Sequence, residues 1–140
     1  MRTEHAGSLD AVPAAPLTLS GAEARALVRR AVLSCLDGES PETPTTRHLM
    51  AEAQLICSEL VSNAHRHGGG LSWFEARAHG GHVVIEVGDR SARMPLSPLR
   101  DATVPGGFGW DLVQRLAERV EVTIPPDGAG KIIRAVVRIA

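Results

Sequence analysis

Residues 56–68 decide the fold, and they read Ile56-Cys57-Ser58-Glu59-Leu60-Val61-Ser62-Asn63-Ala64-His65-Arg66-His67-Gly68. With the turns before them they predict an amphipathic helix, because apolar residues recur at helical spacing: Leu49, Ala53, Ile56, Leu60 and Ala64. At about 100° per residue, Glu59 and Asn63 lie roughly 80° and 40° from Leu49, and His67 lies nearly in line with it. We therefore expect these polar side chains to border or enter the buried face, and glycines 68–70 to end the helix.

A carboxylate and an amide one helical turn apart are unusual at the edge of a core. Burial of a charge is costly unless a partner or a ligand compensates it. Glu59 and Asn63 suit a nucleotide with its Mg²⁺, because an amide oxygen can ligand a hard cation and a carboxylate can act as a base. The same residues also fit a helix-edge pair followed by a histidine that caps the helix.

A hairpin predicted after the helix provides the next unusual carboxylate. Residues 71–79 and 82–88 predict two strands, and Gly80-Gly81 suits a two-residue turn that needs positive φ. Alternation along the second strand places Asp89 on the face of Val83, Ile85 and Val87. Asp89 therefore points inward at the end of the strand, or it caps the turn that follows.

A long loop and a glycine-rich segment come next. Residues 90–105 have two prolines before the last one at position 105 and little periodicity, which is typical of mobile lids and binding segments. Gly106-Gly107-Phe108-Gly109 leads directly into a helix, where bare backbone N–H groups can meet phosphate oxygens. A flexible hinge is the other interpretation of these glycines.

The remaining segments complete an α+β pattern. A capping box at residues 20–23 starts a helix that runs to about Leu36, after a short edge strand at residues 16–19. Thr45 or Thr46 is expected to cap the central helix, and strands are expected at residues 120–124 and 131–139. The order predicts a two-layer α/β sandwich, with helices on one face of a mostly antiparallel, mixed sheet. We expect residues 1–14 to be disordered and residues 15–140 to form one domain.

Composition excludes several classes of function. The net charge of −1 provides no field for nucleic acid, and aromatics at 3% with no tyrosine make a base-stacking surface unlikely to form. No stretch reaches membrane-spanning length, and the N-terminus lacks an apolar signal region. Cys35 and Cys57 fall on apolar helix positions and are expected to be reduced thiols of a cytoplasmic protein, although a disulfide is the alternative.

Together, the three features resemble the Bergerat-type ATP-binding domain shared by gyrase, the heat-shock chaperone ATPases, sensor histidine kinases and MutL. Within that superfamily the chain looks most like the bacterial anti-sigma-factor serine/threonine kinases. Residues 58–68 match that branch's pattern Ser-Glu-Leu-Val-x-Asn-Ala-x-x-His-Gly, and residues 87–91 and 107–117 match its second and third motifs. The resemblance covers roughly residues 15–140.

The resemblance implies ATP and Mg²⁺ as cofactors and a role for each motif residue. Glu59 would be the general base toward a partner's serine or threonine, and Asn63 would coordinate the Mg²⁺. Asp89 would accept a hydrogen bond from the adenine amino group. Gly107 and Gly109 would give close backbone approach to the phosphates, beneath a lid of residues 90–106.

Other positions depart from the family pattern or keep two interpretations. His67 matches a motif position and is expected to contact ligand, to pack or to cap the helix. Trp110 is expected to contact the nucleotide, and both Trp110 and Phe108 are bulky beside the phosphate loop and either seat the lid or obstruct the site. No glycine follows Asp89 until Gly106, and Lys131-Ile132-Ile133 lacks the threonine that reaches adenine through water in relatives.

Three hypotheses result. The first is an ATP-dependent serine/threonine kinase that is also an anti-sigma factor, with a sigma factor or a STAS-type anti-sigma-factor antagonist as partner; relatives commonly form homodimers. The second is an ATP-binding module that sequesters a partner without transferring phosphate. The third is a metal-binding or hydrolytic protein that uses some of the six histidines, of which His65 and His67 point different ways and His79 and His82 flank a turn.

Overall fold

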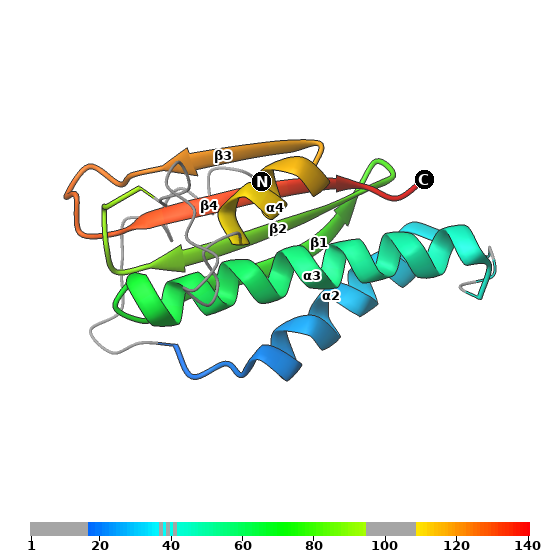
Figure 1. Cartoon of the computed structure of the whole chain (residues 1–140), viewed down its shortest axis with the longest axis horizontal. Coiled ribbons are helices and arrows are strands. Elements are labelled where there is room, and N and C mark those ends of the chain that lie inside the picture. Colours follow the sequence, from blue (N-terminus) through cyan, green and yellow to red (C-terminus); the bar gives the residue numbers. More distant parts are fainter. Residues whose placement is uncertain (1–16, 37, 39, 41, 95–108) are drawn as a thin grey trace.

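A computed structural model describes residues 17–36, 38, 40, 42–94 and 109–140 of the chain. Within them lie three helices and four strands (Figure 1). The helices are α2 (Gly21–Leu36), α3 (Pro44–His67) and α4 (Gly109–Leu116), and the strands are β1 (Leu71–His79), β2 (His82–Asp89), β3 (Arg119–Thr123) and β4 (Lys131–Arg138). The expected disorder of residues 1–14 and most of the expected lid lie outside the described residues.

The four strands form one sheet in the order β1-β2-β4-β3, and each neighbouring pair is antiparallel. The described part of the sheet is therefore antiparallel throughout, in agreement with the mostly antiparallel sheet that we expected, and the parallel pairing of a mixed sheet is not found in it. The expected edge strand at residues 16–19 is also wrong for its described residues. Leu17 donates one backbone hydrogen bond to Leu71, at 2.6 Å, and the chain then turns into α2 after three more residues without continuing the ladder.

All three helices lie on one face of the sheet, with α3 between α2 and α4 (Figure 1). This arrangement confirms the α+β two-layer sandwich. The apolar stripe of α3 is the centre of the core, since Ala53, Ile56, Leu60 and Ala64 are each at most 1% exposed. Full burial of Ile56 or Leu60 contributes about 1.5–3 kcal/mol each. A charge at Leu60 would therefore break the contact between the helix layer and the sheet.

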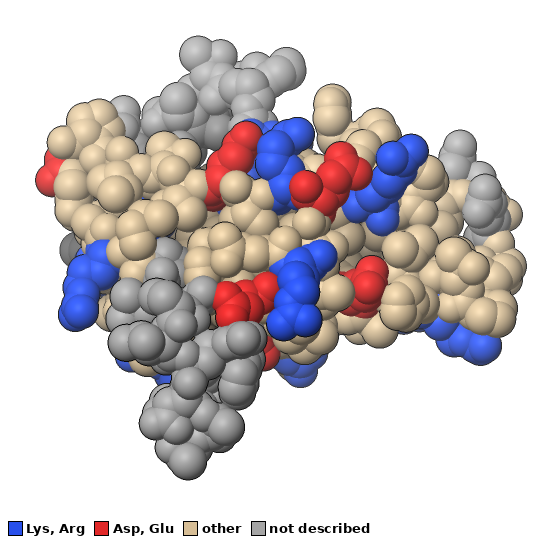
Figure 2. Space-filling model, turned by 45° about the horizontal axis from the view of Figure 1, so that its top comes forward, with Lys and Arg blue, Asp and Glu red and all other residues tan. Residues whose placement is uncertain are grey.

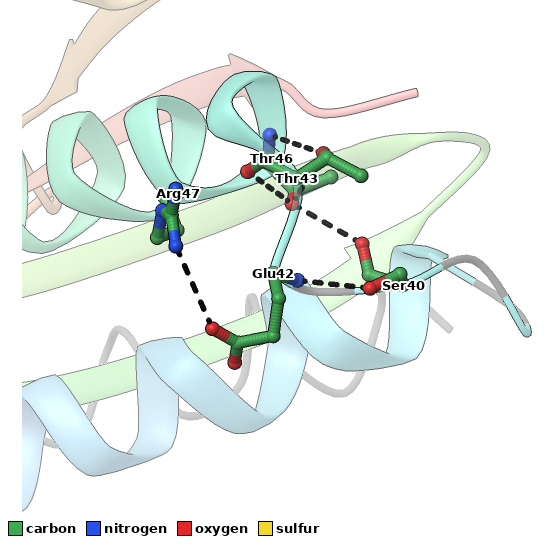
Figure 3. Close-up of polar contacts among 5 residues, drawn as sticks. All are labelled: Ser40, Glu42, Thr43, Thr46 and Arg47. Atoms are coloured by element: carbon green, nitrogen blue, oxygen red, sulfur yellow. Dashed lines mark hydrogen bonds and ion pairs between the residues drawn. The ribbon is translucent and has the colours of Figure 1, made fainter.

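Local side-chain caps fix where the first two helices begin. At α2, the Ser20 hydroxyl accepts from the Glu23 backbone N–H at 3.0 Å, while the Glu23 carboxylate accepts from the Ser20 N–H at 2.8 Å, which confirms the capping box. At α3 the expected cap was wrong. Thr43 is the N-cap, and its hydroxyl accepts from the Thr46 N–H at 3.1 Å (Figure 3). Pro44 explains the earlier start, because its missing N–H and fixed φ suit the first helical position.

The hairpin of β1 and β2 forms as expected, with Gly80 and Gly81 at φ of 56° and 80°. Strand β2 continues to Asp89, one residue beyond the expected end. The inner face of β2 is apolar. On the outer face of the sheet, charged residues of the four strands lie opposite one another in a row: Glu75, Glu86, Arg134 and Glu121. Acidic and basic side chains stand next to one another on the face drawn in Figure 2 and do not gather into a patch of one sign.

The described helices do not have the length and apolar character that would let one of them cross a membrane. Cys57 is buried and Cys35 is half-buried, and both are free thiols. Burial raises the pKa of the Cys57 thiol to about 12. This thiol is therefore protonated at neutral pH and serves as a small apolar core residue.

Candidate functional site

Glu59 lies where α3 meets the start of α4. It is half-buried, as is Asn63 one turn later, so both border the core as the periodicity predicts. A β-carbon on Gly109, the first residue of α4, would collide with the Glu59 Oε1 atom. A larger residue at position 109 would force the Glu59 carboxylate to move from this position. The structure thus brings together Glu59 and Gly109, which are 50 positions apart in the sequence.

Asp89 lies at the other end of the same helix segment. It is 5% exposed and faces Gly68, the C-cap of α3. A β-carbon on Gly68 would lie 2.5 Å from the Cβ, Cγ and Oδ2 atoms of Asp89, so glycine is required there by close packing. The Gly68 carbonyl also accepts from the Arg90 backbone N–H at 2.7 Å, which ties the end of α3 to the end of β2. The inward direction expected for Asp89 is confirmed.

Both oxygens of the Asp89 carboxylate have protein partners. Oδ1 accepts from the Ser91 backbone N–H at 3.0 Å, so Asp89 also caps the following turn, and the two sequence-based interpretations hold together. Oδ2 lies 2.8 Å from Nζ of Lys131, and both side chains are only 6% exposed. Lys131 Nζ also donates to the Ser91 carbonyl at 3.0 Å. Asp89, Ser91 and Lys131 therefore form one buried polar cluster.

Sequence reasoning missed Lys131, which it noted only for lacking a hydroxyl. Lys131 and Asp89 are direct partners in the antiparallel pairing of β2 with β4. One signal could have found it. Lys131 is the only lysine of the chain, and it begins a strand that is otherwise almost entirely apolar on its inner face.

The expected site residues follow one line along α3. The nine positions from Glu59 to Gly68 span about 13 Å at 1.5 Å per residue, with Asn63 between them. The start of α4 adjoins one end of this segment, and the end of β2 and the start of β4 adjoin the other (Figure 1). An elongated ligand along α3 would therefore meet an acid, an amide and a buried polar cluster in turn.

The other expected site residues lie apart from this line or outside the described residues. His67 is exposed, so the expectation that it borders or enters the buried face is wrong; α3 ends at this residue. Trp110 belongs to the hydrophobic core at 9% exposure, and its contact with a nucleotide stays a prediction. Gly107 lies outside the described residues.

Within the described part of the chain, no cluster of three or more His, Cys, Asp or Glu side chains is arranged to hold a metal ion. His82, one of the histidines beside the hairpin turn, instead contacts the Glu118 carboxylate through Nε2 at 3.2 Å. A surface cavity of about 510 Å³ lies elsewhere, and its lining includes Leu49 on α3, Leu116 on α4 and Ile139 after β4. Glu59, Asn63 and Asp89 are not part of it.

The comparisons with known proteins agree with this geometry. A family model described as histidine kinase-like ATPase domain matches residues 18–137, a span that contains every helix and strand of the described structure except the last residue of β4. No curated protein matches the chain at a significant level.

Proposed function

The chain belongs to the histidine kinase-like ATPase domain family, and from this premise we propose an ATP-binding anti-sigma factor that phosphorylates a serine or threonine of an anti-sigma-factor antagonist. Membership in the family accounts for ATP binding as such. The finer proposal adds the acceptor hydroxyl and the regulatory partner. One observation carries it: Glu59, Asn63 and Asp89 follow one another along a single segment of α3 and its neighbours.

The residues at the β2 end of this segment fit the base of the nucleotide. Among the described residues, each carboxylate oxygen of Asp89 accepts one hydrogen bond, which leaves it a second lone pair toward them. An adenine amino group can therefore bind without displacing Ser91 or Lys131. Gly68 packs directly against Asp89 and leaves no room for a larger residue there. The buried carboxylate is suited to a donor-bearing ring.

The residues at the α4 end fit the phosphates and the acceptor. Asn63 presents its amide one turn from Glu59, where it would ligand a cation held by the phosphates. When Mg²⁺ is bound with the nucleotide, it neutralises charge that develops on the transferred phosphoryl group. Glu59 is half-buried, so its carboxylate is open to a partner's hydroxyl. It can accept the proton of that hydroxyl as the new P–O bond forms and the bond between the γ-phosphorus and the bridging oxygen breaks, with ADP as the leaving group. In this proposal Asn63 positions the cation and the phosphates, and Glu59 removes the proton of the acceptor hydroxyl.

A second candidate is an ATP-dependent sequestering module without phosphotransfer. The contact between Glu59 and Gly109 favours it, because a carboxylate at a helix N-terminus interacts favourably with the helix dipole and the free N–H groups. Glu59 would then stabilise the docking of α4 and would take no part in proton transfer. The two candidates differ in what happens to the γ-phosphate.

The test uses ATP labelled at the γ-phosphate, with the full chain and STAS-type antagonist proteins as acceptors. We expect the label on a serine or threonine of an acceptor, and we expect Glu59→Gln to lower the transfer rate by about 10²–10⁴-fold while ATP affinity stays within about threefold. Glu52→Gln is the matched control, because Glu52 lies on the same helix and pairs with His48 at 3.1 Å, away from the site. Normal transfer by Glu59→Gln would remove Glu59 from the mechanism. Tight ATP binding without labelled acceptor would favour the second candidate.

The partners proposed here are a sigma factor and its antagonist, with a second copy of the chain as a homodimer partner. Size-exclusion chromatography of the purified protein, alone and mixed with candidate sigma factors in the presence of ATP, tests both associations. Elution of every mixture as separate monomers would contradict them.

A further inference from the structure

The chain has a single lysine, and the structure places it in the most buried ionic contact of the candidate site. All the other basic residues among its 15 lysines and arginines are arginine. Lys131 is 5% exposed as a whole, and its ammonium lies 2.8 Å from Asp89. A buried ion pair costs desolvation energy that hydrophobic residues of similar volume would avoid. The position of this one lysine therefore invites a functional explanation.

The ammonium retains hydrogen-bonding capacity beyond its protein contacts. A lysine ammonium has three N–H donors. Within the described residues, Lys131 Nζ donates to Asp89 Oδ2 and to the Ser91 carbonyl, which accounts for two of them. Asp89 in turn retains free lone pairs. The Asp89–Lys131 pair therefore offers an acceptor and a donor side by side, where β2 ends and β4 begins.

The Watson–Crick edge of adenine has the matching pattern. Its amino group at C6 is a donor, and the adjacent ring nitrogen N1 is an acceptor. We propose that Lys131 is a specificity-determining residue that donates a hydrogen bond to N1 of bound adenine, while Asp89 accepts one from the amino group. This inference rests on the proposed binding of ATP at the site. The inference adds a direct contact between the Lys131 ammonium and adenine at the start of β4, where the sequence Lys131-Ile132-Ile133 contains no hydroxyl.

Two features of the site support a direct contact by Lys131. The antiparallel register makes Lys131 and Asp89 neighbours on one face, so both groups can reach the same ligand edge. The Ser91 contacts also hold the pair in place, because Ser91 donates to Asp89 and accepts from Lys131. A donor fixed in this way loses little freedom when a ligand binds.

The first experiment observes Lys131 directly in the unaltered protein. With ¹⁵N-lysine labelling, one side-chain Nζ signal is expected, because no other lysine is present. We expect saturating ATP to shift this signal, and 1-deaza-ATP, in which a C–H group replaces N1, to bind about tenfold or more weakly and to leave the signal near its free position. The control, 7-deaza-ATP, keeps N1 and should act like ATP.

The second experiment pairs the ligand change with a protein change. In Lys131→Met, whose side chain has no donor for N1, ATP and 1-deaza-ATP should bind within about threefold of each other, whereas Arg119→Met, at an exposed position of β3, should keep the full discrimination. Equal affinity and equal signal shifts for the two nucleotides in the unaltered protein would overturn the role of Lys131 while leaving ATP binding intact. Absence of any nucleotide binding would overturn the proposed function and this inference with it.

Discussion

Removing the Lys131 charge from the Asp89–Lys131 pair is expected to destabilise the protein far more than removing both charges. Both side chains are 6% exposed, so Lys131→Met leaves the carboxylate without its cation in a site closed by Gly68. Loss of one partner of a buried pair typically costs about 3–5 kcal/mol. Because a domain has a free energy of unfolding of about 5–15 kcal/mol, this variant should be close to unfolding.

The other two variants should be milder, and their comparison isolates the pair. In Asp89→Asn the amide oxygen still accepts from the ammonium, so we expect a loss of about 1–3 kcal/mol. In the double variant both charges are absent, and its stability should lie within about 2 kcal/mol of the natural protein, because a neutral pair leaves no buried charge. The coupling energy of this cycle should reach at least about 2 kcal/mol. Urea unfolding at neutral pH, followed by tryptophan fluorescence, measures all four proteins.

An exposed ion pair is the matched control for this cycle. Arg119 and Glu121 lie 3.3 Å apart on β3, with side chains 57% and 49% exposed. Their cycle should give a coupling energy of about 0–1 kcal/mol, because water screens the pair. If the Asp89 and Lys131 substitutions proved additive within about 0.5 kcal/mol, the two side chains would not form a buried pair, and the argument from burial would be wrong.

Three further predictions test the core and the helix ends. Burial raises the pKa of the Cys57 thiol from 9.0 to about 12, so the contribution of this thiol to stability is complete below pH 9.0 and falls by up to about 4 kcal/mol as pH rises toward 12. Urea unfolding of the natural protein at increasing pH should show this loss of stability. An identical loss in Cys57→Ala would contradict the assignment to Cys57. Gly68→Ala should lose about 1–3 kcal/mol, because the new β-carbon would lie 2.5 Å from Asp89 Cβ, and an unchanged midpoint of thermal unfolding would refute that contact. Thr43→Ala should lose about 1 kcal/mol by removing the cap of α3, whereas Thr45→Ala should stay within about 0.5 kcal/mol; chemical denaturation that gave the opposite order would restore the cap expected from sequence.

Much of the fold could be predicted because its signals are local. The capping box, the apolar stripe of α3 and the glycine hairpin each depend on residues within a few positions of one another. The errors have a physical reason as well. Thr43 was missed as the N-cap because proline at position 44 makes the helix begin earlier in the sequence than expected. The strand expected at residues 16–19 was wrong because a single hydrogen bond from Leu17 to Leu71 does not make a β-ladder.

The residues of the candidate site also fall into two groups: those that a local sequence pattern placed correctly and those that depend on tertiary packing. Periodicity placed Glu59 and Asn63 at the border of the core and turned Asp89 inward, because both effects follow from the repeat of a single helix or strand. Periodicity did not place His67 correctly, because this last residue of α3 is exposed although it lies in line with the buried stripe. Periodicity also says nothing of which segments lie opposite one another.

The sequence by itself determined the class of fold, the helix that carries the acid and the amide, and the direction of the aspartate. Only the tertiary structure decided that Glu59 lies against Gly109 and that the sole lysine is the partner of Asp89. Asp89 and Lys131 are 42 residues apart, and the register between two strands makes them neighbours. Strand register depends on the packing of the whole sheet against its helices, and a local pattern of residues does not contain that information.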